Sequence, residues 1–388
     1  MPSALIAQGG GPTPVMNATL VAAIRQVREV GRTIPRLLGS AYGLRGIIHD
    51  QVYDLLKQDR SVLEGLMNAP GAALGSSREQ LTASDMEALW EAFQRHDIRW
   101  LFYNGGNGSM GTALEIERYA RSSGYELHVI GIPKTVDNDL METDHAPGYG
   151  SAARFWAHAV RDMGLDHLAL PSPILICEVM GRNVGWIAAA TAFARCFPDD
   201  APHLIYCPER PLPRAKLLSD IESVYRRLGR AFVCICEGQL DENGEPFGAD
   251  VDRPDSPQHR LASNLGHAVG KLVSKELRLR VRAERPSLLG RSCSAYVSEV
   301  DRREAELCGR EAVRAAIRGE TGKMVALQRG EGPRYASTAK LVPLENVAYL
   351  ERSLPPEFLA ESGRDITKEF LEYADPLVDE VRCFPRLR

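Results

Sequence analysis

The chain has 388 residues, of which 44% are hydrophobic and 25% charged, and its formal net charge is -4. This composition is typical of an ordinary globular protein, and the length favours two lobes over one. The mild negative charge gives no electrostatic reason to expect nucleic acid or a membrane surface as a partner. No apolar stretch is long enough to cross a bilayer, and the amino-terminal run predicts a strand, not a signal peptide. We therefore expect a cytoplasmic protein.

The cysteines are scattered along the chain without C-x-x-C pairs or metal-ligand spacing. We expect reduced, mostly buried thiols and neither a zinc site nor a catalytic cysteine. The eight residues are Cys177, Cys196, Cys207, Cys234, Cys236, Cys293, Cys308 and Cys383.

Short apolar runs recur along the chain and predict strands that are covered on both faces, because the runs are continuous where a half-exposed strand would alternate. In chain order they occupy residues 4–8, 98–103, 127–133, 173–180, 203–207 and 231–236. Amphipathic helical patterns lie among these runs, at residues 16–30, 86–96, 112–122, 150–164, 182–195, 213–229, 260–278 and 301–318. The succession of strand, turn and helix predicts an α/β fold with doubly wound, mostly parallel sheets.

Ligands in such sheets bind outside the carboxyl ends of the strands, so the turn after each strand is informative. These turns carry glycine, lysine, arginine and carboxylates, a mixture suited to phosphate and sugar chemistry. They occupy residues 9–14, 104–109, 134–139, 181–183 and 237–238.

The turn at residues 104–111 contains the pattern G-x-G-x-x-G from Gly106 to Gly111. A dinucleotide-binding fold also needs an acidic residue at the end of the following strand, whereas Glu126 precedes that strand. A phosphate cradle of backbone N–H groups at the start of a helix fits the pattern better. A nicotinamide enzyme remains a less favoured alternative.

The segment at residues 131–139 is the most specific one, because Lys134, Thr135, Asp137 and Asp139 directly follow a predicted strand. One of the two carboxylates could remove a hydroxyl proton, and the other could organise a metal ion or a phosphate. This density of reactive groups favours a catalytic turn over a salt-bridged surface turn.

Here the chain resembles the phosphofructokinase family, and in particular its pyrophosphate-dependent branch, in which a lysine occupies the place of Lys134. Several short motifs agree in order and spacing over most of the chain. They are GGPTPVMN at 10–17, LGSSR at 74–78, PKTVDND at 133–139, TDHAPGYG at 143–150, EVMGR at 178–182, CEG at 236–238, LGRSC at 289–293 and SEVDR at 298–302.

The resemblance implies two α/β lobes with the active site between them, and transfer of a phosphoryl group to the C1 hydroxyl of fructose 6-phosphate. It makes Asp137 the general base, with Thr135, Lys134 and Arg182 stabilising the transferring group. The donor phosphates would be bound by Gly10, Gly11, Arg78, Gly106, Asn107, Gly108 and Ser109. The sugar phosphate would be bound by Thr135, Asp137, Met180, Gly181, Arg182, Glu237, Leu288 and Arg291.

The glycine-rich turn before the helix predicted at 112–122 departs from the family. ATP-dependent relatives have GGDG and the pyrophosphate branch has GGDD or GGND, whereas this chain has Gly106-Asn107-Gly108-Ser109. Magnesium would therefore be held by Asn107 and Asp139 with one carboxylate fewer, which weakens a hard-cation site.

Two residues give opposite indications about the donor. Gly108 removes an obstruction to a nucleotide, while Lys134 can take over the role of nucleotide contacts. We favour pyrophosphate and keep ATP as the alternative. Leu288 stands where relatives usually have tyrosine, so a kinase for another sugar phosphate stays open, as does a weakened regulatory homologue that only binds the sugar.

By resemblance, residues 1–147 form the donor lobe, completed by about 280–325. Residues 148–279 form the sugar-phosphate lobe, and 326–388 wrap that second lobe. The family also implies a homodimer or homotetramer, with Arg291 a candidate to reach into the neighbouring subunit.

Overall fold

The computed structural model describes residues 1–78, 80–170, 172–247, 264–332 and 334–386. The chain forms two compact units, each built from two stretches of sequence. The first unit comprises Met1–Tyr149 and Arg291–Arg352, and the second comprises Gly150–Gly290 and Ser353–Arg388. No helix in the described part of the chain combines the length and apolar character of a transmembrane span.

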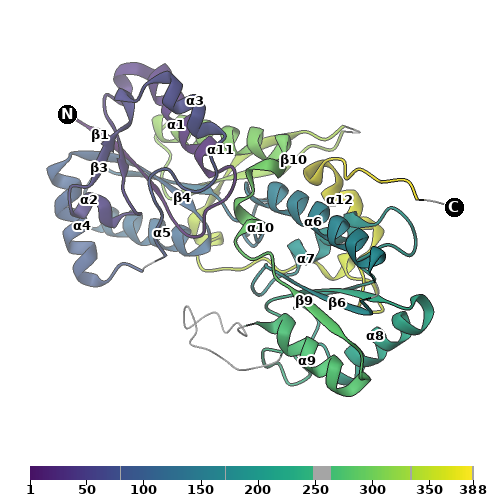
Figure 1. Cartoon of the computed structure of the whole chain (residues 1–388). Coiled ribbons are helices and arrows are strands. Elements are labelled where there is room, and N and C mark those ends of the chain that lie inside the picture. Colours follow the sequence, from purple (N-terminus) through teal and green to yellow (C-terminus); the bar gives the residue numbers. More distant parts are fainter. Residues whose placement is uncertain (79, 171, 248–263, 333, 387–388) are drawn as a thin grey trace. The chain divides into compact units, whose positions relative to one another are not determined.

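A seven-stranded sheet with the order β11-β10-β5-β4-β1-β2-β3 organises the first unit (Figure 1). Its strands are β1 (Ser3–Gln8), β2 (Leu37–Ser40), β3 (Val52–Asp54), β4 (Ile98–Gly105), β5 (His128–Pro133), β10 (Lys323–Arg329) and β11 (Ser337–Pro343). The two edge strands, β3 and β11, run antiparallel to their neighbours, and the five others are parallel.

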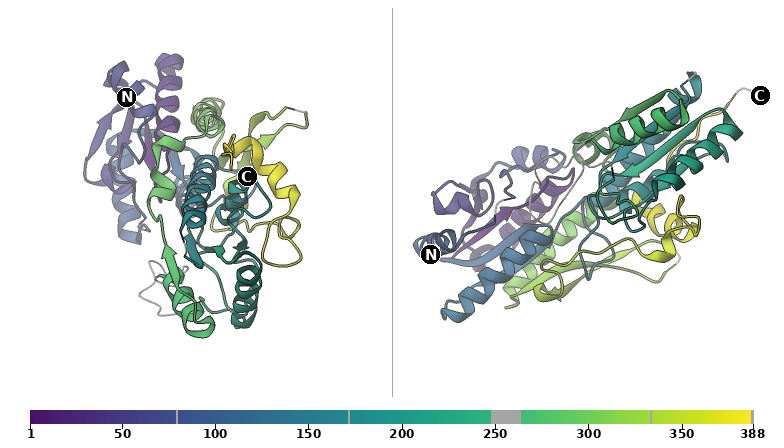
Figure 2. Two further views of the ribbon diagram at one scale, coloured as in Figure 1. Left: turned by 45° about the vertical axis from the view of Figure 1, so that its right-hand side comes forward. Right: turned by 90° about the horizontal axis from the view of Figure 1, so that it is seen from below.

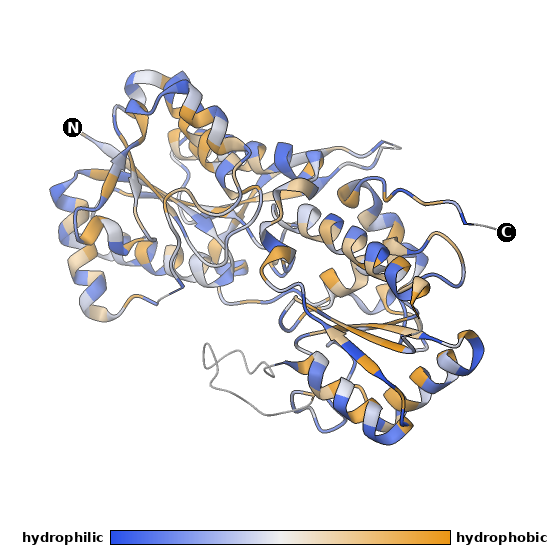
Figure 3. Ribbon diagram, in the orientation of Figure 1, coloured by the Kyte–Doolittle hydropathy of each residue, from blue (hydrophilic) through white to orange (hydrophobic). Residues whose placement is uncertain are grey.

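Helices cover both faces of this sheet, which explains why its central strands are apolar throughout. Along β1, Ile6 packs into a cluster with α1 and α11, whereas the adjacent Leu5 packs into a second cluster with α4 and α5. Figure 3 shows the apolar residues along the strands and on the inner faces of the helices. The helices are α1 (Met16–Val30), α2 (Arg45–Ile48), α3 (Arg60–Met67), α4 (Ala83–Arg95), α5 (Asn107–Ser122) and α11 (Glu299–Ile317), with 3-10 turns η1 (Gly31–Thr33), η2 (Leu55–Lys57), η4 (Ser294–Tyr296) and η5 (Leu344–Asn346).

The helix ends follow from local sequence. Thr82 caps α4 by accepting the N–H of Asp85, whose carboxylate accepts the N–H of Thr82 in return. Ser298 accepts the N–H of Asp301 and so caps α11. At the end of α8 (Arg214–Leu228), in the second unit, Gly229 adopts a left-handed conformation with φ of 69°, which glycine reaches at no steric cost.

A four-stranded parallel sheet with the order β7-β8-β6-β9 organises the second unit. Its strands are β6 (Ile174–Val179), β7 (Leu204–Tyr206), β8 (Ala231–Cys236) and β9 (Val281–Glu284). Its helices are α6 (Tyr149–Ala169), α7 (Trp186–Ala190), α8 (Arg214–Leu228), α9 (Leu265–Leu277) and α12 (Lys368–Val378), with 3-10 turns η3 (Thr191–Ala194) and η6 (Pro356–Phe358). The boundary between the units falls within the short helix α10 (Leu289–Ser292). The views in Figures 1 and 2 show α8 and α9 on one face of this sheet and α6 and α7 on the other. Two mostly parallel α/β sheets were the prediction, and it is confirmed.

The six predicted strands are all present, as β1, β4, β5, β6, β7 and β8. The helix predicted at 182–195 is shorter, because residues 181–185 form a turn and α7 begins only at Trp186. The start of the helix predicted at 260–278 lies outside the described residues, and α9 runs from Leu265 to Leu277.

The unit boundaries differ from the prediction at two places. β9 pairs with β6, so residues 280–290 belong to the second unit and not the first. β10 pairs with β5, and β11 with β10, so residues 326–352 belong to the first unit and only Ser353–Arg388 to the second. Both boundaries depend on which distant segments pair as strands. The hydrophobic periodicity of the sequence does not specify these pairings.

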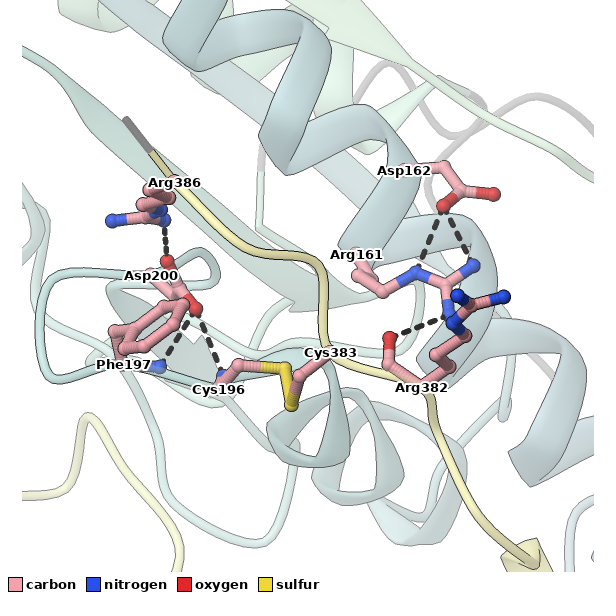
Figure 4. Close-up of a disulfide and its surroundings, with 8 residues drawn as sticks. All are labelled: Arg161, Asp162, Cys196, Phe197, Asp200, Arg382, Cys383 and Arg386. Carbon is pink, nitrogen blue, oxygen red and sulfur yellow. Dashed lines mark hydrogen bonds and ion pairs between the residues drawn. A yellow bond between two sulfur atoms is a disulfide. The ribbon is translucent and has the colours of Figure 1, made fainter. Parts of the chain in front are cut away.

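The cysteine prediction was wrong for one pair. Cys196 and Cys383 form a disulfide, with their Cα atoms 5.7 Å apart. Figure 4 shows the carboxyl-terminal segment lying along the turn that carries Cys196, where Arg386 pairs with Asp200. The two cysteines are 187 residues apart, so their spacing alone could not reveal the pairing. Among the free cysteines, five are buried as expected and Cys293 is half-buried.

Candidate active site

The turn after β1 is held by backbone hydrogen bonds from two neighbouring segments. The Gly9 N–H donates to the Asn104 carbonyl (2.8 Å), and the Gly10 N–H donates to the Ser77 carbonyl (2.9 Å). Gly10 has a φ of 77°, a left-handed conformation that favours glycine. The turn therefore has a fixed shape at the carboxyl end of β1.

Two buried amide side chains next to this turn fix the segment that leads to Arg78. Gln8 Oε1 accepts the N–H of Leu74 (3.1 Å), and Asn17 Oδ1 accepts the N–H of Ala73 (2.8 Å). Gln8 and Asn17 are almost fully buried, so these bonds are shielded from water. Arg78 is thus carried on a loop that is tied to β1 and α1.

Three cationic side chains reach the glycine turn. The Lys134 ammonium donates to the Gly11 carbonyl (2.7 Å). A Cβ placed on Gly11 would lie 2.8 Å from Nη1 of Arg291 and 3.4 Å from Nη2 of Arg78. A side chain at Gly11 would therefore displace the Arg291 guanidinium and touch that of Arg78. This gathering of positive charge is suited to an anion of high charge, such as a phosphate.

Helix α5 starts at Asn107, earlier than the predicted start at 112, so the glycine pattern is the first turn of a helix and not a separate loop. Gly106 is the N-cap residue, and no side chain caps its helix end. Such an end exposes backbone N–H groups and favours anions. Ser109 is buried, and its side chain packs against the backbone of Gly9 and Gly105. Its position supports the shape of the turn.

Asn107 and Asp139 meet beside this helix end. Asn107 Nδ2 donates to Asp139 Oδ2 (2.9 Å). The remaining side-chain oxygens, Asn107 Oδ1 and Asp139 Oδ1, are both buried and make no hydrogen bond with the described residues. Two buried, unpaired oxygens on neighbouring side chains are the kind of ligand that a hard divalent cation prefers. No group of three or more His, Cys, Asp or Glu side chains elsewhere in the described chain forms a candidate metal cluster.

The turn after β5 carries the predicted base. Thr135 Oγ1 accepts the Asp137 N–H (3.1 Å), which fixes the backbone of Asp137 against the threonine side chain. Asn138 has a φ of 58°, and its Oδ1 accepts the Ala146 N–H (3.0 Å). The side chains of Lys134 and Thr135 are buried, whereas Asp137 is half-buried.

Sequence reasoning missed Arg352, which holds this turn from the far end of the first unit. Its guanidinium donates to the carbonyls of Asn138, Thr143 and Asp144, and its N–H donates to the Asp139 carbonyl (2.8 Å). One arginine thus satisfies four carbonyls of a turn that has no regular structure. The motif comparison gave no signal for it, because Arg352 lies beyond the matched segments.

A buried ionic network lies behind the same turn. His145 is 1% exposed, with Nδ1 2.7 Å from Asp144 Oδ2 and Nε2 2.5 Å from Glu304 Oε2. Burial alone would lower the pKa of His145, but the charge of Glu304 and the hydrogen bonds to both carboxylates raise it to about 9. Arg329 pairs with Asp144 (3.0 Å), whose pKa these contacts lower to about 2. The turn is therefore anchored to α11 by charges that compensate one another.

In the second unit, Glu237 holds the turn after β6. Its Oε1 accepts the N–H groups of Gly181 and Arg182, both at 3.2 Å. Arg182 has a φ of 52° and Gly181 a φ of 145°, conformations that need such support in a non-repetitive turn. A Cβ on Gly238 would lie 1.6 Å from the Arg182 carbonyl oxygen, so the two turns touch through their backbones.

Arg285, a second missed residue, follows β9 and bridges two carboxylates. Its Nε lies 3.0 Å from Glu178 Oε1, and its Nη2 lies 3.5 Å from Glu237 Oε2. Glu178 is 3% exposed, and its other oxygen accepts the Gly266 N–H (2.8 Å). Burial raises the pKa of Glu178, against the opposing effect of Gly266 and Arg285. Arg285 thus neutralises a buried acid and contacts the residue that shapes the Arg182 turn.

The predicted residues are distributed over the two units. The first unit contains the glycine turn with its three cationic side chains, the turn after β5 and the first turn of α5. Its predicted residues are Gly10, Gly11, Arg78, Lys134, Thr135, Asp137, Asp139 and Arg291. Met180, Gly181, Arg182, Glu237 and Leu288 belong to the second unit, where Leu288 is 61% exposed. Arg291 was predicted to bind the sugar phosphate, and its guanidinium lies beside Gly11 of the same chain.

Comparisons with known proteins agree with one another. Residues 3–316 match the family described as Phosphofructokinase. A pyrophosphate--fructose 6-phosphate 1-phosphotransferase of Rhodospirillum rubrum is 39% identical over 382 residues, which covers 96% of this chain and 93% of the relative. An enzyme of the same name from Xanthomonas campestris pv. campestris is 36% identical and covers 96% and 91%. The solved pyrophosphate-dependent phosphofructokinase of Marinobacter aquaeolei is 30% identical, with a TM-score of 0.88 and coverage of 100% and 94%.

Proposed function

Because this chain belongs to the phosphofructokinase family, we propose that it transfers a phosphoryl group from pyrophosphate to the C1 hydroxyl of fructose 6-phosphate, giving fructose 1,6-bisphosphate. One observation carries the choice of donor. The buried Lys134 side chain donates from its amino group to the Gly11 carbonyl, so a basic side chain lies at the glycine turn. A compact, highly charged donor without a nucleoside gains most from such a side chain.

In this proposal Asp137 is the general base that removes the proton from the C1 hydroxyl. A positioned base of this kind contributes about 10²–10⁴ in rate. Lys134, Arg78 and the N–H groups at the start of α5 bind the donor phosphates, and Arg182 stabilises charge on the transferring group. Glu237 and Met180 contact the sugar, with Glu237 also fixing the Arg182 turn.

Magnesium fits the side-chain oxygens Asn107 Oδ1 and Asp139 Oδ1, which are buried and make no hydrogen bond with the described residues. When bound, the ion would supply charge neutralisation on the donor phosphates. The protein contributes two oxygens and a single carboxylate charge at this point, so substrate phosphates and water would complete the ligand set.

ATP is the second candidate donor, and Gly108 favours it. A Cβ placed on Gly108 would meet no described atom within 4 Å, so this residue leaves room for a larger donor. An assay matrix separates the candidates: pyrophosphate or ATP, with fructose 6-phosphate or other sugar phosphates, over a range of magnesium and with a chelator. We expect turnover with pyrophosphate and fructose 6-phosphate that the chelator abolishes. Sugar binding without turnover of either donor would support a regulatory homologue instead.

Asp137→Asn tests the base. The variant should lose about 10²–10⁴ of kcat while binding fructose 6-phosphate with little change, because the amide cannot accept the proton. Glu142→Gln is the matched control, since it removes an exposed carboxylate from the same turn. A fully active Asp137→Asn variant would show that another group takes the proton.

A further inference from the structure

The donor turn, residues 105–109, lies at the start of α5. On the helix face that runs from this turn toward the carboxyl end of α5, an open position, Gly108, is followed by a covered one, Gly111. Gly108, Gly111 and Glu115 are spaced three and four residues apart, so they lie along one face of the helix. At Gly108 an added Cβ would meet no described atom within 4 Å. At Gly111 it would lie 2.1 Å from Cζ of Tyr349, because the tyrosine ring packs on the glycine.

Gly108 is the position in the donor turn at which a substituent of the donor has room. Added Cβ atoms at Gly9, Gly10, Gly11 and Gly105 would meet neighbours within 3.0 Å, and one at Gly106 within 3.5 Å. A substituent on a diphosphate bound at the start of α5 therefore has more space at Gly108 than at Gly9, Gly10, Gly11 or Gly105. From Gly108, such a substituent would continue along the helix face toward Gly111.

Tyr349 is held over that face by its hydroxyl and by its backbone. The hydroxyl donates to Glu115 Oε1 (2.6 Å), one helix turn beyond Gly111. The residue before it, Ala348, is buried, and the Ala348 N–H donates to the Leu344 carbonyl (2.8 Å). The side of the ring away from the helix is open, since Tyr349 is 53% exposed.

Tyr349 adopts a backbone conformation that is costly for its residue type. Its φ is 61°, in the left-handed region that bulky residues rarely occupy. Such outliers persist where the surrounding structure imposes them, and they cluster at ligand-binding sites. A tyrosine here, in a position suited to glycine or asparagine, places an exposed aromatic ring next to the donor turn.

We propose that Tyr349 is a donor-specificity residue, whose ring occupies the part of the α5 face that the nucleoside of ATP would need. Pyrophosphate ends at the helix start and does not reach the ring, whereas a nucleoside leaving at Gly108 meets it. The inference rests on the proposed function, because it takes the donor phosphates to bind at the first turn of α5. It also explains how an open Gly108 is compatible with use of pyrophosphate.

Steady-state kinetics with both donors test the proposal. Tyr349→Gly and Tyr349→Asn remove the ring and suit the left-handed backbone, so both should fold. We expect the ratio of kcat/KM for ATP to that for pyrophosphate to rise about ten-fold or more in both variants, the range in which a pocket contact discriminates substrates. Tyr349→Phe keeps the ring and loses only the hydroxyl, so its ratio should stay within about three-fold of the parent protein.

An unchanged ratio, or a lower one, in the glycine and asparagine variants would overturn the proposal. A lower ratio would mean that the ring stacks on the base and promotes nucleotide binding. Calorimetric titration with a non-hydrolysable ATP analogue gives a readout that does not depend on turnover, and we expect tighter binding to Tyr349→Gly than to the parent. If the parent protein turns over no pyrophosphate, the proposed function fails by itself, while the titration still decides the role of Tyr349.

Discussion

At the first turn of α5, an amide and a carboxylate form the pair of residues that would hold magnesium. Asn107 donates to Asp139 through its nitrogen, and each residue keeps one buried oxygen without a hydrogen bond to the described chain. The amide compensates the carboxylate when no cation is bound, whereas two carboxylates at this distance would repel each other. In the proposed metal site, this pair would therefore bind the cation less tightly than two carboxylates and would be more stable in the metal-free protein.

Asn107→Asp should tighten magnesium binding and destabilise the metal-free protein. We expect the magnesium concentration for half-maximal activity to fall about ten-fold, because an added ligand charge tightens a hard-cation site. The Tm without magnesium should fall, and the rise in Tm on adding magnesium should increase. Activity and thermal melts over a magnesium series measure both effects, and an unchanged magnesium dependence would remove Asn107 from the ligand set.

Arg285 acts through the carboxylates it bridges. Arg285→Gln leaves the buried Glu178 without its counter-charge and removes the ion pair with Glu237, which holds the Arg182 turn. We expect the KM for fructose 6-phosphate to rise and kcat to fall, each by about ten-fold, since breaking one partner of a buried pair is costly. Arg285→Lys should recover part of the loss.

A double variant separates positioning from simple loss of a contact. Arg285→Gln combined with Glu178→Gln removes the uncompensated buried charge, so it should fold better and bind the sugar better than Arg285→Gln alone. Additive effects of the two substitutions would contradict coupling of Arg285 to the turn through Glu178.

At the scale of elements, α11 fixes the segment that follows the proposed catalytic turn by two contacts. Asp301 accepts the Gly148 N–H (2.7 Å), and Glu304 pairs with the buried His145. Tyr335 also contacts Glu304, and Arg329 contacts Asp144, so charged or polar groups from α11, β10 and the chain after β10 face the histidine. The turn keeps its shape because a helix more than 150 positions later in the chain supplies its counter-charges.

His145→Gln should reveal how this anchoring depends on pH. The pKa of His145 is raised from 6.5 to about 9, so the stabilisation is complete below pH 6.5 and is lost as pH rises through 9. A shift of this size corresponds to about 3 kcal/mol. Denaturant unfolding of both proteins at several pH values measures it, and the difference in unfolding free energy should shrink from pH 6.5 to 9. A difference that stays constant over that range would show that His145 is neutral in the folded protein.

The contribution of Asp144 depends on pH in the opposite direction. Its pKa is lowered from 3.8 to about 2, so its stabilising effect is present above pH 3.8 and is lost as pH falls toward 2. The network as a whole should therefore stabilise the protein most between about pH 4 and 6.5.

At the scale of the whole molecule, each unit is completed by a segment from the last part of the chain. In the first, β10 and β11 complete the sheet, and in the second, α12 and the residues after it return to the turn at Cys196. Arg161 donates to the Arg382 carbonyl (3.1 Å; Figure 4). The Arg161 guanidinium also lies 4.9 Å from the centre of the Phe384 ring. The disulfide is thus one of several contacts that hold the carboxyl-terminal segment.

Reduction should loosen this segment. We expect a dithiol reductant to lower the free energy of unfolding by about 2–4 kcal/mol, a typical effect of removing a disulfide. Trypsin should then cleave faster after Arg382. Cys383→Ser should reproduce both effects without reductant, whereas Cys293→Ser, at a half-buried free cysteine, should not.

Alkylation in denaturant without reductant counts the thiols directly. The disulfide predicts six modified cysteines before reduction and eight afterwards. Eight modified cysteines in protein prepared without reductant would mean that the pair is reduced, as the sequence first suggested.

The sequence by itself determined six of the strands (β1 and β4 to β8), most of the longer helices, the α/β class and the family, and it indicated the turns that are proposed to carry the chemistry. These features depend on local periodicity and on short motifs such as the segment from Lys134 to Asp139, so neighbouring residues are enough to specify them. The tertiary structure decided which distant segments meet. Arg352, Arg285, the partners of His145, the disulfide and Tyr349 on Gly111 all depend on side chains brought together from far along the chain. The free energy of closing a loop rises only slowly with its length, so the loops between such residues can have almost any length. The spacing of these residues in the sequence therefore does not predict that they meet.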